Sequence, residues 1–233
     1  MFVPIGDDNS LKSIHFQYVT VGLIALNVLV YILQTAGGSS DALVASFAVV
    51  PQELFQVHVV GGHAPFSADA IAVPERDTLF SYMFLHADPM HLLGNMLFLW
   101  VFGDNVEDAM GHMRFAVFYI ICGVAAALMH AMMQPASEAG LIGASGAVSG
   151  VIAAYLILHP RVNVWVLAFN VIPLRITAAW VLGFWIVFQV AMAMFPPSDE
   201  AVATAWWAHI GGLLAGGFLI LVLRRPGVAI LQR

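Results

Sequence analysis

Six apolar runs, each close to the length of a bilayer-spanning helix, constrain this chain more than any other feature. A helix needs about 20 predominantly apolar residues to cross the hydrocarbon core of a membrane. The runs cover about residues 16–36, 82–103, 114–134, 143–159, 176–195 and 204–223. Hydrophobic residues make up 61% of the 233 residues and charged residues only 9%, unlike a soluble domain. The sequence therefore predicts an all-α membrane protein of six transmembrane helices, with residues 1–233 forming one domain.

The basic residues predict how these helices are oriented. With a cytoplasmic N-terminus, seven of the eight basic residues fall on the cytoplasmic side, and Arg76 alone falls outside. The seven are Lys12, Arg114, Arg161, Arg175, Arg224, Arg225 and Arg233. Cytoplasmic loops of membrane proteins carry an excess of Lys and Arg, so both termini are expected in the cytoplasm. We expect a multi-pass protein of a bacterial inner (plasma) membrane.

Residues 37–81 form the longest outer connection, in which glycine and proline breakers flank an apolar piece. We expect short helices lying in the membrane interface here. The chain shows no basic run of the kind that binds nucleic acid. Its single cysteine, Cys122, lies in an apolar run, so an intramolecular disulfide and a cysteine-rich metal site are both excluded.

The stretch from Gly143 to Gly150 opens the fourth run and holds a hydroxyl, that of Ser145, between small residues. The first turn of a helix has backbone N–H groups without intrahelical partners, and such groups can stabilise an oxyanion. Ser145 could therefore act as a nucleophile. Gly146 and Gly150 also form a Gly-x-x-x-Gly pair, which in membranes commonly serves helix packing alone. This stretch by itself leaves both interpretations open.

His209 lies near the start of the sixth run, at the same outer depth as Ser145. Gly212 and Gly216 follow at spacings of three and seven and share its helix face, which could approach the small residues of the fourth run. A histidine in an apolar segment is costly unless it is partnered or functional. His209 could accept the Ser145 proton as a general base, or it could serve only as an interhelical hydrogen bond.

The outer end of the second run supplies further polar groups at this depth. His91 and Asn95 are four residues apart on one helix face, and both can donate hydrogen bonds to an oxyanion. The simpler role for Asn95 is an interhelical hydrogen bond. His86 precedes His91 by five residues, so we expect it to have a supporting role.

The acidic residues limit the kind of hydrolase that could be built here. All 14 lie outside the interiors of the third to sixth runs, which predicts a Ser–His dyad without the carboxylate of the usual triad. The acids in outer segments that could approach the site are Asp88, Glu138, Asp199 and Glu200.

Jointly these residues resemble the rhomboid family of intramembrane serine proteases. The matching pieces are Gly143-Ala144-Ser145-Gly146, Ala208-His209-Ile210-Gly211-Gly212, and the segment from Phe84 to Asp108 that contains His86, His91 and Asn95. They span about residues 80–223. The resemblance implies Ser145 as nucleophile, His209 as general base, and His91 with Asn95 as oxyanion donors. His86, Gly143, Gly146 and Gly212 are then supporting residues.

The resemblance also implies a rhomboid-like six-helix bundle with a water-filled cavity open to the outside. Such a protein would cleave transmembrane segments of other proteins within the lipid bilayer, without metal or cofactor. The fifth run and the loop at Phe195-Pro196-Pro197 are a candidate substrate gate, because proline interrupts the helix end. The sequence does not specify the substrate or the oligomeric state.

Two departures from the family pattern concern the support of the base and the first outer loop. Many relatives have an aromatic residue four positions after the nucleophile, where this chain has Ser149. The Trp-Arg pair common in the first outer loop is missing, and only Arg76 stands near that place.

Two other functions are alternatives to a protease, namely a catalytically inactive binder of membrane clients and a transporter lined by histidines. A transporter usually carries intramembrane carboxylates, which the third to sixth runs lack.

Overall fold

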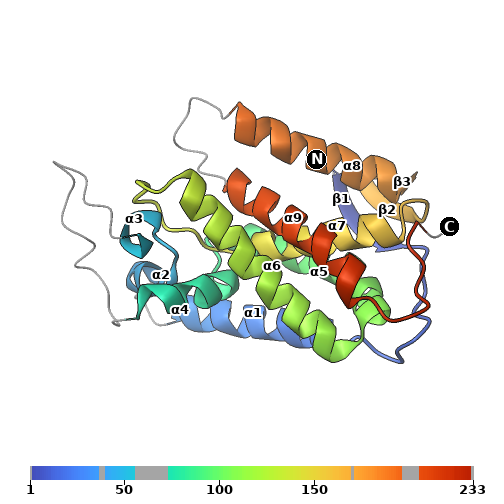
Figure 1. Cartoon of the computed structure of the whole chain (residues 1–233), viewed down its shortest axis with the longest axis horizontal. Coiled ribbons are helices and arrows are strands. Elements are labelled where there is room, and N and C mark those ends of the chain that lie inside the picture. The colour runs from blue at the N-terminus through green and yellow to red at the C-terminus, as the bar shows by residue number, and fades with distance from the viewer. Residues whose placement is uncertain (1, 37–39, 56–72, 169–170, 196–204, 232–233) are drawn as a thin grey trace.

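The structure is a computed structural model that describes residues 2–36, 40–55, 73–168, 171–195 and 205–231. The helices are α1 (Tyr18–Ala36), α2 (Ser40–Phe47), α3 (Pro51–Leu54), α4 (Glu75–Ser81), the 3-10 turn η1 (Tyr82–Phe84), α5 (Pro89–Met110), α6 (His112–Met133), α7 (Ser145–Leu158), α8 (Ala178–Met194) and α9 (Trp206–Leu223). The strands are β1 (Phe2–Asp7), β2 (Asn163–Ala168) and β3 (Ile172–Thr177). The protein is therefore mostly helical, as expected (Figure 1).

Each of the six predicted runs contains a helix, namely α1 and α5 to α9. Three of the described helices, α1, α6 and α9, are long and apolar enough to cross a membrane, whereas α7 and α8 are shorter apolar helices. The second run differs most from its prediction, because α5 begins at Pro89 and continues to Met110. Asp88 caps it by accepting hydrogen bonds from the backbone N–H groups of Met90 and His91, at 2.8 and 2.9 Å. This cap separates α5 from η1.

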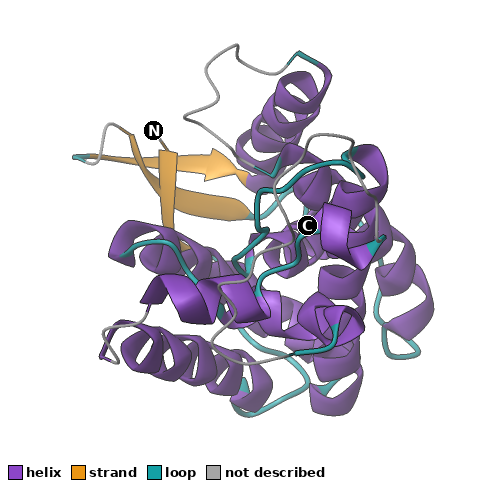
Figure 2. Ribbon diagram, turned by 90° about the vertical axis from the view of Figure 1, so that its left-hand side faces the viewer, coloured by secondary structure: helices purple, strands orange, loops and turns teal. Residues whose placement is uncertain are grey.

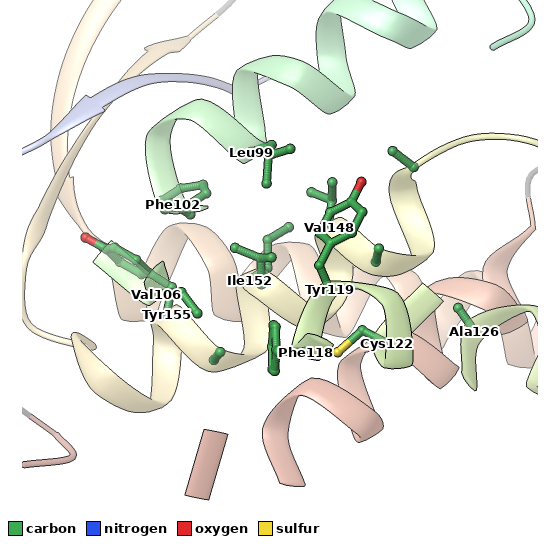
Figure 3. Packing of buried hydrophobic residues seen from close by; sticks show 14 of the residues in the cluster. Leu99, Phe102, Val106, Phe118, Tyr119, Cys122, Ala126, Val148, Ile152 and Tyr155 are labelled. Carbon is green, nitrogen blue, oxygen red and sulfur yellow. The ribbon is translucent and has the colours of Figure 1, made fainter. Parts of the chain in front are cut away.

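Helix α7 is the centre of the bundle. Every residue from Gly146 to Tyr155 is buried, as expected for a helix that is apolar on all sides. Its side chains pack between α5 and α6, where Phe102 of α5 meets Tyr155 with ring centroids 4.8 Å apart (Figure 3). The core of the molecule therefore surrounds the helix that begins at Ser145.

Helices α7 and α9 contact each other through their backbones. A Cβ atom on Gly212 would lie 1.9 Å from the carbonyl oxygen of Gly146, and one on Gly216 would lie 2.2 Å from that of Gly150. Any side chain at these positions would force the helices apart, so the small-residue faces set the separation. The sequence predicted this pairing of the fourth and sixth runs.

A three-stranded antiparallel sheet, with the order β1-β2-β3, corrects the prediction that the fold is all-α (Figure 2). The predicted helices left residues 160–175 without an assigned element, but β2 alternates buried with less buried residues as a strand does. The N-terminal strand pairs with it from far away in the sequence. Asp8, which follows β1, forms an ion pair with Arg175 of β3 at 2.5 Å and accepts a hydrogen bond from Trp165 of β2 at 3.1 Å. It therefore links all three strands.

The end of α5 binds the N-terminal segment through two neighbouring carboxylates. Asp108 accepts hydrogen bonds from the backbone N–H groups of residues 12–14, at 2.6–3.1 Å. Glu107 accepts from the N–H groups of Val19 and Thr20, at 3.0 and 2.8 Å. The Glu107 oxygens satisfy backbone donors in the first turn of α1 that have no partner within the helix, and Asp108 binds the segment that precedes α1. Glu107 and Asp108 therefore fix α1 to α5.

The two chain ends lie at one end of the bundle. Strand β1 lies there, and the segment after α9 returns to α5, where the Arg225 N–H donates to the Ala109 carbonyl at 2.8 Å. Helices α2, α3 and α4 lie at the opposite end (Figure 1). They belong to the predicted interfacial connection 37–81, of which residues 37–39 and 56–72 lie outside the described part. Val49 and Leu141 form an isolated β-bridge that ties this connection to the loop before α7.

Candidate active site

Ser145 and His209 face each other across the α7–α9 contact. The Ser145 Oγ atom lies 2.9 Å from the His209 Nε2 atom, within hydrogen-bonding distance. Ser145 is the first residue of α7 and is partly buried, whereas His209 is buried in the first turn of α9. Gly146 and Gly212 make their backbone contact beside this pair, and so fix the distance between hydroxyl and imidazole.

His209 has further partners that the sequence analysis did not identify. Its Nδ1 atom lies 2.6 Å from the Oε1 atom of Gln189 on α8. The rings of Trp185 and Trp206 lie 6.0 and 6.2 Å from the imidazole between centroids. These contacts supply the support that the absence of an aromatic residue at Ser149 had left unexplained. Ser149 instead donates a hydrogen bond to the Ser145 carbonyl at 2.6 Å.

The turn before Ser145 requires glycine at position 143. Gly143 has a φ of +114°, a backbone conformation that L side chains rarely adopt. A Cβ atom there would also lie 2.8 Å from the His91 Nε2 atom. The Gly143 N–H donates to the carbonyl of Tyr82 at 2.9 Å, which anchors the turn to η1. The turn thus brings the α5 side chains close to the start of α7.

Asn95 and His91 lie beside this turn on α5. The Asn95 Nδ2 atom is buried, lies 3.8 Å from the Cβ position of Gly143, and has no hydrogen-bond partner among the described residues. A buried donor without a partner costs free energy, which is regained if an acceptor arrives. The N–H of Ala87 makes a long hydrogen bond of 3.5 Å to the His91 Nδ1 atom, which leaves Nε2 to carry the proton. Both side chains therefore offer donors beside the turn at Gly143, two residues before Ser145.

His86 lies behind His91, with ring centroids 5.1 Å apart in an edge-to-face arrangement. Both ring nitrogens of His86 are buried and lack a hydrogen-bond partner in the described part of the chain. Its backbone carbonyl accepts a hydrogen bond from the Gln34 side chain of α1 at 2.8 Å. His86 thus contacts His91 rather than Ser145 or His209, consistent with a supporting position.

The four acidic residues that the sequence suggested could approach the site lie in different parts of the chain. Asp88 caps α5, and Asp199 and Glu200 lie outside the described residues, as do Pro196 and Pro197 of the candidate gate loop. Glu138 lies in the loop between α6 and α7. Within the described ranges, the group at His209 Nδ1 is the amide of Gln189 and not a carboxylate. The same ranges contain no group of three or more His, Cys, Asp or Glu arranged to hold a metal ion.

A family model described as the rhomboid domain matches residues 75–226, which contain all of these side chains except Gln34. This chain belongs to the rhomboid family. Rhomboid proteins are integral membrane proteins, and the family typically comprises serine proteases that act on membrane proteins within the bilayer.

Similar rhomboid proteins come from plants, bacteria and yeast. RHOMBOID-like protein 5 of Arabidopsis thaliana is 33% identical over 65% of this chain and 46% of its own length. Rhomboid protease AarA of Providencia stuartii is 26% identical over 86% of this chain and 70% of its own length. Rhomboid protein 1, mitochondrial, of Saccharomyces cerevisiae is 26% identical over 62% of this chain and 41% of its own length. The chain thus spans about half the length of the plant relatives it matches.

Proposed function

We propose that the protein is an intramembrane serine endopeptidase that cleaves transmembrane segments of other membrane proteins with a Ser145–His209 dyad. The observation that carries this proposal is the 2.9 Å separation of Ser145 Oγ from His209 Nε2. A nucleophile and its base must lie within about 2.6–3.2 Å for proton transfer to accompany attack. Membership of the rhomboid family supports the same reaction.

In the first half of the reaction, the Ser145 oxygen attacks the carbonyl carbon of a substrate peptide bond. His209 Nε2 accepts the hydroxyl proton as the new C–O bond forms. The resulting imidazolium then gives this proton to the leaving amine as the C–N bond breaks. The product is an ester between Ser145 and the acyl part of the substrate.

In the second half, a water molecule attacks the ester while His209 accepts its proton. The intermediate collapses, the C–O bond to Ser145 breaks, and the proton returns to the serine oxygen. In both halves negative charge develops on the carbonyl oxygen. Asn95 Nδ2, His91 Nε2 and the Ser145 backbone N–H are the donors that we assign to this oxyanion, because preorganised donors stabilise the transition state more than water does.

The proposal includes six membrane spans and cytoplasmic termini in a bacterial inner (plasma) membrane. It rests on the six apolar runs of the sequence, each of which overlaps a helix, and on the position of both chain ends at the end of the bundle opposite α2 to α4 (Figure 1). Arg114, Arg175 and Arg225 bond to Leu223, Asp8 and Ser13 at the same end as the termini, whereas Arg76 lies in α4 at the opposite end. Single cysteines, placed in turn at the exposed His15 between β1 and α1 and in α4 of a Cys122→Ala background, test this orientation. A membrane-impermeant thiol reagent should label intact spheroplasts at α4 only.

Cleavage of a model transmembrane substrate in proteoliposomes tests the function. Wild type, Ser145→Ala and His209→Ala are compared, with and without a chelator. We expect cleavage by wild type that the chelator leaves unchanged, and none by either variant. Cleavage by Ser145→Ala would exclude this residue as the nucleophile. Sensitivity to the chelator would favour a metal-dependent protein, and failure of wild type on several substrates would favour a client-binding protein.

A further inference from the structure

The buried face of α8 contains one polar side chain. The buried residues of this helix are Ala178, Leu182, Gln189 and Ala193, which follow one another at spacings typical of a single helix face. Three of them are apolar, and Gln189 is only 4% exposed. A buried amide is costly unless its hydrogen bonds are made, so a glutamine on this face needs a partner.

The partner of Gln189 is His209. The Gln189 Oε1 atom lies 2.6 Å from His209 Nδ1, and a carbonyl oxygen can only accept a hydrogen bond. The contact therefore places the proton of the neutral imidazole on Nδ1. The lone pair of Nε2 then faces the Ser145 hydroxyl at 2.9 Å, which is the tautomer that a general base must have.

We propose that Gln189 is a positioning residue of the catalytic pair, and this inference rests on the proposed function. Gln189 accepts the Nδ1–H of His209, holds the ring in the tautomer that can take the Ser145 proton, and stabilises the imidazolium formed during attack. It occupies the place that a carboxylate has in a Ser-His-Asp triad, with a neutral oxygen instead of a charged one. A neutral acceptor avoids placing a charge in a buried site.

The position of Gln189 links this contact to the packing of α8. Helix α8 lies at the edge of the bundle beside α9, and much of its surface is exposed (Figure 1). Trp180 and Phe184, for example, are 77% and 68% exposed. His209 therefore has both of its ring partners only while α8 is packed on α9. A displacement of α8 would leave Ser145 and His209 in place, but the proton of the neutral His209 ring would no longer be held on Nδ1.

Three variants separate positioning from packing. Gln189→Met keeps the length and volume of the side chain but removes the strong acceptor, whereas Gln189→Glu keeps an acceptor and adds charge. Val190→Met, at the neighbouring exposed position, is the matched control. We expect Gln189→Met to lower kcat about tenfold or more with KM unchanged within about twofold, because a general base contributes about 10²–10⁴-fold. Val190→Met should resemble wild type.

The pH dependence of kcat distinguishes a positioning role from a structural one. The carboxylate of Gln189→Glu would favour the charged imidazolium, so deprotonation of the base would require a higher pH. We therefore expect the acidic limb of its profile to move to higher pH. Among the described residues, the titratable side chains that act electrostatically on His209 are His91 of α5 and His130 of α6, and both are the same in every variant. A lowered rate with an unchanged profile in Gln189→Glu would indicate packing alone.

The tautomer can also be read without any cleavage. The ¹⁵N chemical shifts of labelled histidine, assigned by comparison with His209→Ala, report which ring nitrogen carries the proton. We expect the Nδ1–H form in wild type and a mixture in Gln189→Met. Wild-type tautomer and wild-type kcat in Gln189→Met would overturn the inference while leaving the Ser–His mechanism standing. Failure of the proposed function would instead appear as no cleavage by wild type.

Discussion

Two helices support His209, and they are held in different ways. Helix α9 contacts α7 through glycine backbones, with the Cβ positions of Gly212 and Gly216 only 1.9 and 2.2 Å from α7 carbonyl oxygens. Helix α8 has a glycine too, but Gly183 has no described atom within 4 Å of its Cβ position. The distance between Ser145 and His209 is therefore set by backbone contact, whereas the support from Gln189 depends on side-chain packing alone.

Substitution at the backbone contact should have the largest effect. In Gly212→Ala the new methyl group would overlap the Gly146 carbonyl, so α9 must shift and carry His209 away from Ser145. We expect loss of cleavage and a destabilisation of about 1–3 kcal/mol, as in other overpacked cores. Initial rates and thermal unfolding in detergent measure the two effects.

The neighbouring Gly217 is the matched control for that experiment. Its Cβ position is 3.6 Å from the nearest described side-chain atom, which is an ordinary contact. Gly217→Ala should therefore cleave at the wild-type rate. Full activity in Gly212→Ala would show that the backbone contact does not set the geometry of the pair.

Two of the three proposed oxyanion donors, Asn95 and His91, lie on α5, whereas α8 and α9 support His209. Asn95→Ala removes a donor while leaving the contact between Ser145 and His209 intact. We expect kcat to fall about 10²–10³-fold, as for the loss of one oxyanion donor elsewhere. Thermal stability should hold or rise, because the Nδ2 atom has no partner in the described structure. A change confined to KM would assign Asn95 to substrate binding instead.

Helix α8 should tolerate a glycine-to-alanine substitution at Gly183, whereas α9 should not tolerate one at Gly212. Gly183→Ala adds a methyl group where the described structure leaves space, and alanine favours helix over glycine by about 1 kcal/mol. We expect unchanged activity and a small gain in thermal stability. Loss of activity in Gly183→Ala would mean that α8 is packed as tightly as α9 in the membrane.

The smallest effect concerns the sheet, far from His209. Hydrogen bonds from Arg175 and Trp165 hold the pKa of Asp8 below its usual value of 3.8. A depressed pKa stabilises the folded state above the unfolded value, and this contribution is lost as pH falls through the folded pKa. Asp8→Asn should therefore unfold at a slightly lower temperature than wild type at pH 6, and the difference should shrink below pH 3.8 and vanish below the folded pKa. A difference that persists in acid would have another cause.

The sequence predicted the apolar helices and the pairing of α7 with α9 because both depend on local patterns. Apolar runs identify the helices, and the spacing of His209 with Gly212 and Gly216 identified the face that meets α7. Short-range spacing and hydrophobicity are sufficient for such conclusions. The orientation in the membrane, which rests on positive charge, stays a prediction.

Contacts between distant segments were not predicted. Strand β1 pairs with β2 across more than 150 residues, and Glu107 accepts a hydrogen bond from Val19 in the first turn of α1, 88 residues earlier. Gln189 was missed for the same reason, since it reaches His209 from another helix. One local signal could have identified it, because Gln189 is the one side-chain amide in the otherwise apolar segment 178–194. A polar residue in a membrane helix marks a candidate functional site.

Labelling with a fluorophosphonate probe tests most directly whether the α7–α9 contact makes a reactive serine. The probe reacts with a serine only when a base activates it, and mass spectrometry identifies the modified residue. We expect modification of Ser145 in wild type and in Gly217→Ala, slower modification in Gln189→Met, and none in His209→Ala or Gly212→Ala. Modification of Ser145 at the wild-type rate in His209→Ala would contradict the dyad.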